Sequence, residues 1–369
     1  MTEPLLTVVI PTKNRPDFLS RLLHYYADTR SPYSILIGDS SDPEILEETQ
    51  SVIQDFRGTL QVNHRSYPTY EGYPSDLGLT ETLSDLLEHV ATKYVVLVAD
   101  DDVVIPDAIA EAVRFLELHS DYSAVHGKAA LCGLSGRVQG DVKWIQPYPM
   151  PQITGLTALE RLRSHFRTGR PTEFSVKVTQ QMRRHWQMRR ALGMNNRFGE
   201  LLVSCLGVIQ GKVHHMDRLY MVRQGHPGMR SRNPAIEELI TNPAWSEQYV
   251  RFRDTLTEEL MRWDGIPPDQ AKDEIQRGFF YYMVKIMLKK GPAYLQGMED
   301  PSSLASQSPL WRRLAQRSPV ARRQWQRVRS MLLPGEVHRM TLPALLRAGS
   351  PTREDFVPVY RSLTGEEDA

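Results

Sequence analysis

The stretch YVVLVADDDVVIPDA, residues 94–108, decides the fold. Its first six residues are apolar or aromatic, which is typical of a strand that is buried on both faces. Three carboxylates follow at once, Asp100, Asp101 and Asp102, and Pro106 then opens a helical pattern. A strand that runs into a helix in this way places the carboxylates at the carboxyl edge of a parallel sheet, where open α/β sheets bind their ligands.

Three adjacent carboxylates repel one another, so we expect a cation to compensate them. A hard divalent cation shared with a phosphate group is the natural candidate, because such ions prefer oxygen ligands. The cluster therefore points to a metal-dependent enzyme that acts on a phosphorylated or nucleotide substrate. A solvated surface loop is the alternative reading of the same residues.

The residues before this stretch alternate between strand and helix patterns. The predicted strands are residues 5–10, 33–38 and 60–64, and the predicted helices are residues 16–23 and 77–90, with another beginning near Asp42. Together with the strand before the Asp cluster, this order predicts an α/β fold with one mostly parallel sheet and helices on both of its faces.

The pattern changes after residue 123. The predicted strands are residues 123–131 and 138–145, joined through the turn CGLSGR, and residues 213–223; the predicted helices are residues 154–166, 179–192 and 198–210. Beyond about residue 235 the chain is polar and helical. We therefore predict a catalytic domain over residues 1–235 and a helical extension over residues 236–369, for acceptor, membrane-surface or subunit contact.

Composition excludes several classes of protein. Of the 369 residues, 41% are hydrophobic and 24% are charged, and the net charge of +1 argues against a general binder of nucleic acid. Two cysteines far apart, Cys132 and Cys205, argue against a disulfide-rich secreted fold and a cysteine zinc site. The amino end does not resemble a signal peptide and no run of about 18 apolar residues occurs, so we expect a cytoplasmic protein.

The common nucleotide motifs are missing. No GxGxxG follows the first strand, Gly211-Lys212 lacks the rest of a phosphate-binding loop, and no HExxH occurs. Three segments remain: VVIPTKNRPDFLSRLL from Val8, ILIGDSSDPE with Asp39 at a strand end, and the Asp cluster.

In this order and spacing, the three segments resemble the family-2 glycosyltransferases, which have the nucleotide-sugar-binding GT-A fold. The resemblance covers residues 5 to about 120 well and extends loosely to about 225. It implies a metal-dependent, inverting transfer of a sugar from a nucleotide-diphosphate sugar, most commonly a UDP-sugar, to a glycan or lipid-linked acceptor. Synthesis of a surface polysaccharide or glycoconjugate would use such a reaction.

The resemblance also assigns roles to residues of the three segments. It implies a nucleotide pocket lined by Pro11, Thr12 and Arg15, a nucleobase contact at Asp39, a ribose contact at Asp100, and a Mn²⁺ or Mg²⁺ ligand at Asp101 or Asp102. Counting back from Pro106 favours Asp102 as the last motif position and Asp101 as the main ligand; the resemblance also places Asp101 in the nucleotide site. Many members carry Arg-Asn where this chain has Leu83-Ser84-Asp85, so Lys13, Arg15 or a later basic residue would have to contact the phosphates.

The catalytic base is expected well after the metal motif, at the start of a helix. Glu200 in GMNNRFGELLVSCLG fits that place, and Asp141 and Asp217 are weaker candidates. The alternative reading of Glu200 is an acid that merely stabilises a helix start. A late His serves as a further metal ligand in some GT-A enzymes, and His226 is the candidate here, although most loop histidines have no such role.

Two basic stretches could bind anions. Residues 161–197 hold ten Arg or Lys and one acid, Glu173; they could bind an anionic acceptor or the leaving diphosphate, or form a solvated helix face. Residues 310–334 interleave Arg with Trp and Leu, which suits peripheral contact with the inner face of a membrane, or a packed amphipathic helix.

Two other functions stay open. Nucleotidyl transfer to a sugar phosphate also uses a metal–carboxylate site, but PTKNRPD is a poor substitute for its usual glycine-rich basic loop. A non-catalytic nucleotide-binding scaffold is the second alternative. The sequence leaves the donor sugar, the acceptor and the oligomeric state open, a homo-oligomer included.

Overall fold

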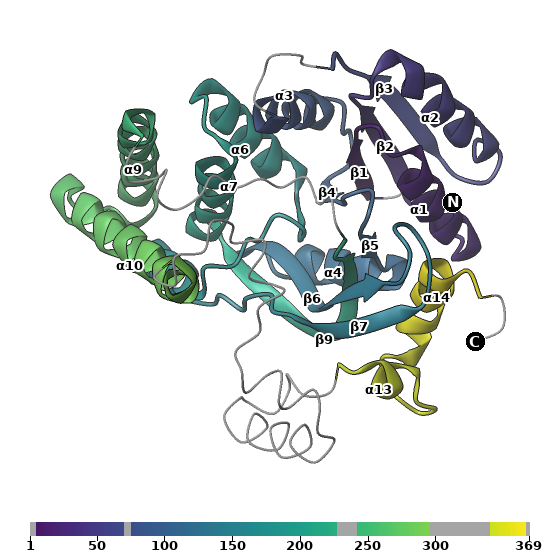
Figure 1. Cartoon of the computed structure of the whole chain (residues 1–369). Helices are drawn as coiled ribbons and strands as arrows, with labels where there is room; N and C mark the ends of the chain where they lie inside the picture. Colours follow the sequence, from purple (N-terminus) through teal and green to yellow (C-terminus); the bar gives the residue numbers. More distant parts are fainter. Residues whose placement is uncertain (1–4, 70–74, 227–241, 295–339, 367–369) are drawn as a thin grey trace.

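The computed structural model of the chain describes residues 5–69, 75–226, 242–294 and 340–366 (Figure 1). Residues 310–334, the predicted membrane-contact stretch, lie outside these ranges. Within the described ranges, no helix has both the length and the apolar character that crossing a bilayer requires.

One nine-stranded sheet forms the centre of the described chain. Its strands run in the order β3-β2-β1-β4-β8-β6-β9-β5, and β7 pairs with β6 at the side. The strands are β1 (Leu6–Thr12), β2 (Ser34–Asp39), β3 (Val62–Ser66), β4 (Tyr94–Leu97), β5 (Val103–Val104), β6 (Tyr122–Leu134), β7 (Val142–Tyr148), β8 (Val176–Val178) and β9 (Lys212–Gln224).

Helices cover both faces of this sheet, which confirms the predicted fold class (Figure 1). The helices are α1 (Pro16–Asp28), α2 (Pro43–Asp55), α3 (Ser75–Glu88), α4 (Pro106–Leu118), α5 (Ala158–Thr168), α6 (Thr179–Ala191), α7 (Asn196–Gln210), α9 (Pro243–Asp264), α10 (Pro268–Tyr294), α13 (Leu342–Leu346) and α14 (Arg353–Thr364).

The direction of the strands differs between the two halves of the sheet. The four strands β3, β2, β1 and β4 are parallel, as the β-α-β-α order predicts. Beyond β4 the sheet is mixed: β8 is antiparallel to both of its neighbours, β6 and β9 are parallel, and β5 is antiparallel to β9. Three-residue β8 and two-residue β5 are too short to give a periodic pattern in the sequence.

The central strands are buried on both faces. In β4, Tyr94 and Val96 pack into the core beneath α1 and α4, while Val95 and Leu97 pack into the core beneath α3 and α6. Alternate residues of a strand point to opposite faces, so a strand covered on both sides has to be apolar throughout. This explains the unbroken apolar run before Asp100.

The helices after residue 236 join the cores of the earlier part of the chain. Helices α9 and α10 share a hydrophobic core with α5 and α7, through Phe252 and Ile275 among others. Helix α14 adds Phe356 and Val359 to the core that contains α1. The division at residue 235 stays a prediction, but the later helices bury their apolar faces against the α/β part (Figure 1).

Candidate active site

The Asp cluster lies at the carboxyl edge of the parallel strands. Strands β1 and β4 are parallel neighbours, so the residues that follow each strand meet at one edge. Thr12, the last residue of β1, donates a hydrogen bond from its Oγ1 to Asp100 Oδ2 over 2.8 Å. Arg15 reaches both Asp100 and Asp101, each over 3.0 Å. Thr12, Arg15, Asp100 and Asp101 therefore form one buried group, as the sequence predicts.

The turn between β1 and α1 brings Arg15 to this edge. Asn14 has a left-handed backbone (φ 54°), which Asn tolerates better than most residues, and its side chain accepts from the Asp42 backbone N–H. Pro16 then begins α1, where the missing N–H of proline costs nothing.

His226 completes the surroundings of Asp101. Its Nε2 lies 2.9 Å from Asp101 Oδ2, and its ring stacks on Phe18 with 4.9 Å between ring centroids. The side chain of His226 is only 3% exposed, so the ring is held in place by packing. The structure thus joins residues that lie 125 positions apart in the sequence.

Asp102 lies on the other side of the cluster, against β9. Its Oδ2 accepts from Arg223 Nε over 2.9 Å, and its Oδ1 accepts from the backbone N–H of Gln224 over 3.2 Å. The guanidinium of Arg223 lies over the rings of Tyr148 and Phe174. Both oxygens of Asp102 are therefore in use.

Arginine side chains compensate the negative charge of the Asp cluster in this structure, a role for which the sequence suggests a metal ion. Arg15 serves Asp100 and Asp101, and Arg223 serves Asp102. Burial still raises the pKa of Asp100 to about 6 and that of Asp102 to about 7, against the opposing effect of the arginines. Burial acts on Asp101 in the same direction, but the hydrogen bond from His226 and the charge of Arg15 outweigh it and lower its pKa.

The residues present fit a divalent cation that is held mainly by its substrate. Among the described residues, no group of three or more His, Cys, Asp or Glu could hold a metal ion alone. His226 Nε2 and Asp101 Oδ2 lie 2.9 Å apart and contact each other, so a divalent cation held by both would have to replace this contact. Mg²⁺ and similar ions are usually bound by one or two carboxylates, with phosphate and water oxygens filling the remaining positions.

Asp39 and Pro11 lie on the strands next to this cluster. Pro11 is opposite Gly38 in the β1–β2 register, and Asp39 ends β2 opposite Thr12. The Asp39 carboxylate is fully buried; its Oδ1 accepts from the Ser41 N–H, while Oδ2 has no hydrogen-bond partner among the described residues and lies 3.6 Å from His64 Nε2. A buried acceptor of this kind is costly, so a donor from a ligand would stabilise it.

Glu200 lies on the second turn of α7, which the Asn195 side chain caps. Its Oε1 accepts from Asn196 Nδ2 over 2.9 Å. Glu200 lines a cavity of about 60 Å³ together with Arg170, Arg197 and Tyr282. The carboxylate is therefore half-buried beside cationic groups, as a proton acceptor in a partly dry site should be.

Glu173 is a buried carboxylate whose pKa responds to the charge of Glu200. Burial, together with the nearby charge of Glu200, raises the pKa of Glu173 to about 7, and Arg223 is among the charges that act on it in the opposite direction. The cation closest to the Glu173 carboxylate in the described structure is Arg189, whose Nη1 lies 4.0 Å from Glu173 Oε1. Sequence reasoning missed Glu173 and Arg223, since neither has a motif and the position of Arg223 depends on the pairing of β9 with β5 and β6.

The weaker candidates for the base lie on the surface in ion pairs. Asp141 is paired with Lys143 over 2.9 Å, and Asp217 with Lys128. The side chains of Asp141 and Asp217 are 76% and 84% exposed, so water screens both charges. Asp107, an acid in the first turn of α4, contacts Arg218.

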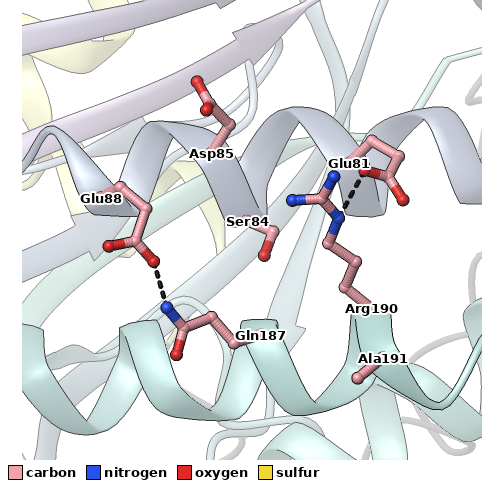
Figure 2. A pocket seen from close by; sticks show the side chains of 7 residues that line it. All are labelled: Glu81, Ser84, Asp85, Glu88, Gln187, Arg190 and Ala191. Carbon is pink, nitrogen blue, oxygen red and sulfur yellow. Dashed lines mark hydrogen bonds and ion pairs between the residues drawn. The ribbon is translucent and has the colours of Figure 1, made fainter.

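Leu83, Ser84 and Asp85 lie on α3. Leu83 is buried, and Asp85 accepts from Tyr67 over 2.6 Å. Figure 2 shows Ser84 in a groove between α3 and α6, between the contacts of Glu81 with Arg190 and of Glu88 with Gln187. The groove contains none of the predicted site residues. The carboxylates of the Asp cluster pair instead with Arg15 and Arg223.

Comparisons with solved structures find distant likenesses. TarS from S. aureus is 13% identical with a TM-score of 0.47; the alignment covers 75% of this chain and 43% of TarS. The mannosyltransferase PcManGT from Pyrobaculum calidifontis, in complex with GDP-Man and Mn²⁺, is 12% identical with a TM-score of 0.39, covering 90% of this chain and 86% of that one.

A third structure is glucosyl-3-phosphoglycerate synthase from Mycobacterium tuberculosis, in complex with Mn²⁺, UDP and glucosyl-3-phosphoglycerate. It is 15% identical with a TM-score of 0.34, and the alignment covers 71% of this chain and 80% of that one. The ligands in these structures are those of the neighbours. No curated protein matches the sequence.

A family comparison is more direct. The sequence model described as glycosyl transferase family 2 matches residues 7–170, which include β1, the Asp cluster and the cationic segment before Glu173. The order and geometry of Thr12, Arg15 and Asp100–Asp102 agree with that match. The match shows that residues 7–170 of this chain are similar to glycosyl transferase family 2.

Proposed function

We propose that the protein is a metal-dependent, inverting glycosyltransferase that moves a sugar from a UDP-sugar to a glycan or lipid-linked acceptor. The observation that carries this proposal is the arrangement around Asp101, which lies between Arg15 and His226 at the edge where β1 and β4 end. A carboxylate, an imidazole and a guanidinium at one buried point suit a diphosphate and its divalent cation.

The donor would lie along the edge of the parallel strands. Asp39 would accept from the nucleobase through Oδ2, which makes no hydrogen bond within the described residues, with Pro11 and Thr12 beside it. Asp100 would contact the ribose, and Arg15 the diphosphate. Mn²⁺ or Mg²⁺, held by Asp101 and His226, would stabilise the charge of the departing diphosphate. Asp102 remains a predicted ligand, but it would have to exchange Arg223 for the metal.

Glu200 would act as the general base. As an acceptor hydroxyl attacks the anomeric carbon, its proton passes to the Glu200 carboxylate and the new carbon–oxygen bond forms. The bond between the anomeric carbon and the diphosphate oxygen breaks, and the electron pair leaves with the nucleoside diphosphate. Attack from the side opposite the diphosphate inverts the anomeric configuration. A positioned base of this kind contributes roughly 10²–10⁴-fold to the rate.

The test combines a panel of nucleotide sugars with two matched variants. In the presence of Mn²⁺, the wild type should hydrolyse or transfer from one donor, with nucleoside diphosphate released. Glu200→Gln should lower kcat by about 10²-fold or more while UDP still binds. Glu258→Gln changes the same functional group at an exposed position of α9 and should have no effect. A wild type that neither binds nucleotide nor turns over any donor would refute the proposal.

A further inference from the structure

The cavity beside Glu200 is lined by residues from several parts of the chain. It is formed by the end of α5, the following loop, α7 and α10, and it includes none of the residues Asp100–Asp102. Gly169 ends α5 in a left-handed conformation (φ 58°), which turns the chain so that Arg170 lines the cavity. A volume of about 60 Å³ suits one small group, because a single water needs roughly 10–15 Å³ on this measure.

Cationic and donor groups line this cavity. Arg197 and Arg170 contribute two guanidinium groups, and the hydroxyl of Tyr282 hydrogen-bonds with Arg197. Arg170 is half-buried and forms no ion pair with any described residue. Two guanidinium groups offer the forked geometry that carboxylate and phosphate oxygens accept.

His165 provides an independent sign of a missing ligand. It lines the same cavity and is 1% exposed, yet neither ring nitrogen has a hydrogen-bond partner within the described ranges. Burial lowers the pKa of His165 to about 4, so the ring is neutral near pH 7 and offers one N–H donor. A buried ring with an unused donor costs free energy, which a bound acceptor oxygen would recover.

We infer that this cavity binds an anionic group of the acceptor, a phosphate or a carboxylate, next to the hydroxyl that is to be glycosylated. The inference rests on the proposed function, because Glu200 marks the place of that hydroxyl. The donor diphosphate belongs to the other side of the site, with Arg15 and Asp101. An anion held by Arg170 and Arg197 beside the base must then come from the acceptor molecule.

Helix α10 gives this subsite its outer wall. Tyr282 comes from α10, and Lys285 one turn later donates to the carbonyl oxygens of Arg167 and Thr168 at the end of α5. The helix thus fixes the loop that carries Arg170. Part of the helical extension would therefore serve acceptor recognition, one of the roles that the sequence suggests for it.

The test begins with inorganic phosphate as the probe. Its binding to the full chain should weaken at least tenfold in Arg170→Gln and in Arg197→Gln, measured by calorimetry. Arg167→Gln is the matched control: it removes the same charge from the same helix end, but its side chain is exposed and lies outside the cavity. It should bind phosphate as the wild type does. Equal binding by all three variants would overturn the inference.

A second arm separates an acceptor group from free phosphate. Neutral glycosides and their phosphorylated or carboxylated counterparts are offered as acceptors, with a donor that the wild type turns over. Only the anionic acceptors should show a KM raised tenfold or more in Arg170→Gln. A KM that is unchanged, or raised equally for neutral acceptors, would refute the inference while the transferase proposal stands. A wild type without turnover of any donor would instead refute the proposed function, and with it the assignment to an acceptor.

Discussion

Removing Arg223 should reveal how strongly the fold depends on compensation of the Asp cluster. Arg223 lies 2.9 Å from Asp102, whose side chain is 1% exposed. At this distance the attraction between the two charges is about 6 kcal/mol for an effective dielectric constant near 20, and the cost of burying both groups offsets part of it.

The variant Arg223→Met keeps a shorter, unbranched side chain and removes the charge, its hydrogen bonds and the guanidinium contacts with the Tyr148 and Phe174 rings. Removing one partner of a buried ion pair lowers the free energy of unfolding by about 3–5 kcal/mol. We expect the lower end of that range, because the Gln224 N–H still donates to Asp102. In the double variant with Asp102→Asn the free energy of unfolding should recover by about 2 kcal/mol or more relative to the sum of the single changes.

Urea unfolding at pH 8, followed by tryptophan fluorescence and far-UV circular dichroism together, would give the four free energies of the cycle. The exposed pair of Lys143 and Asp141 provides the control, and its coupling energy should not exceed about 1 kcal/mol. Additive effects of the Arg223 and Asp102 changes, or a loss below about 1 kcal/mol for Arg223→Met, would refute the electrostatic account of the cluster.

Three further predictions concern stability. Burial lowers the pKa of His185 to about 3, so its neutral form stabilises the fold fully above pH 6.5 and that contribution is lost as the pH falls toward 3. His185→Gln should remove about 1.4 kcal/mol per pH unit of this dependence below pH 6, seen as the difference between variant and wild type in urea midpoints at several pH values. Gly199→Ala would place a Cβ 2.3 Å from Arg189 Nε and should cost about 1–3 kcal/mol, whereas Gly58→Ala has open space around it and should change little; equal costs would contradict the close approach. Thr157→Ala removes the capping box of α5 and should lower the free energy of unfolding by about 1 kcal/mol. An unchanged free energy of unfolding would show that water replaces the Thr157 side chain without loss.

The sequence predicts the parallel half of the sheet well, because its strands are apolar on both faces and its helices begin at prolines. Pro16, Pro43 and Pro106 each open a helix close to the predicted place. The turn after β6 was placed too early: the sequence assigns CGLSGR to a turn, but β6 continues through Cys132 to Leu134. Pairing with β7 and β9 holds this segment extended despite its glycine.

The parts of the site that the sequence predicts are those at the ends of regular parallel strands and His226, which the family resemblance names. Thr12, Arg15 and the Asp cluster meet because β1 and β4 are adjacent in a regular α/β order. No sequence pattern reveals the position of Arg223, because that position depends on where β9 lies in the mixed half of the sheet, between β6 and β5. Glu173 lies outside the helices and strands, and no local pattern reveals its burial.

The packing of α14 against the first helix has a consequence for biosynthesis. Arg218 of β9 binds Asp355 of α14 over 2.6 Å, and Phe356 packs into the core that includes α1. More than three hundred residues separate α1 from α14, which at ribosomal speeds of roughly 5–20 residues per second is about 15–60 seconds of synthesis. During that interval the nascent α/β domain exposes the apolar surface that α14 later covers, so this surface is where a chaperone would bind and where arrested chains would begin to aggregate.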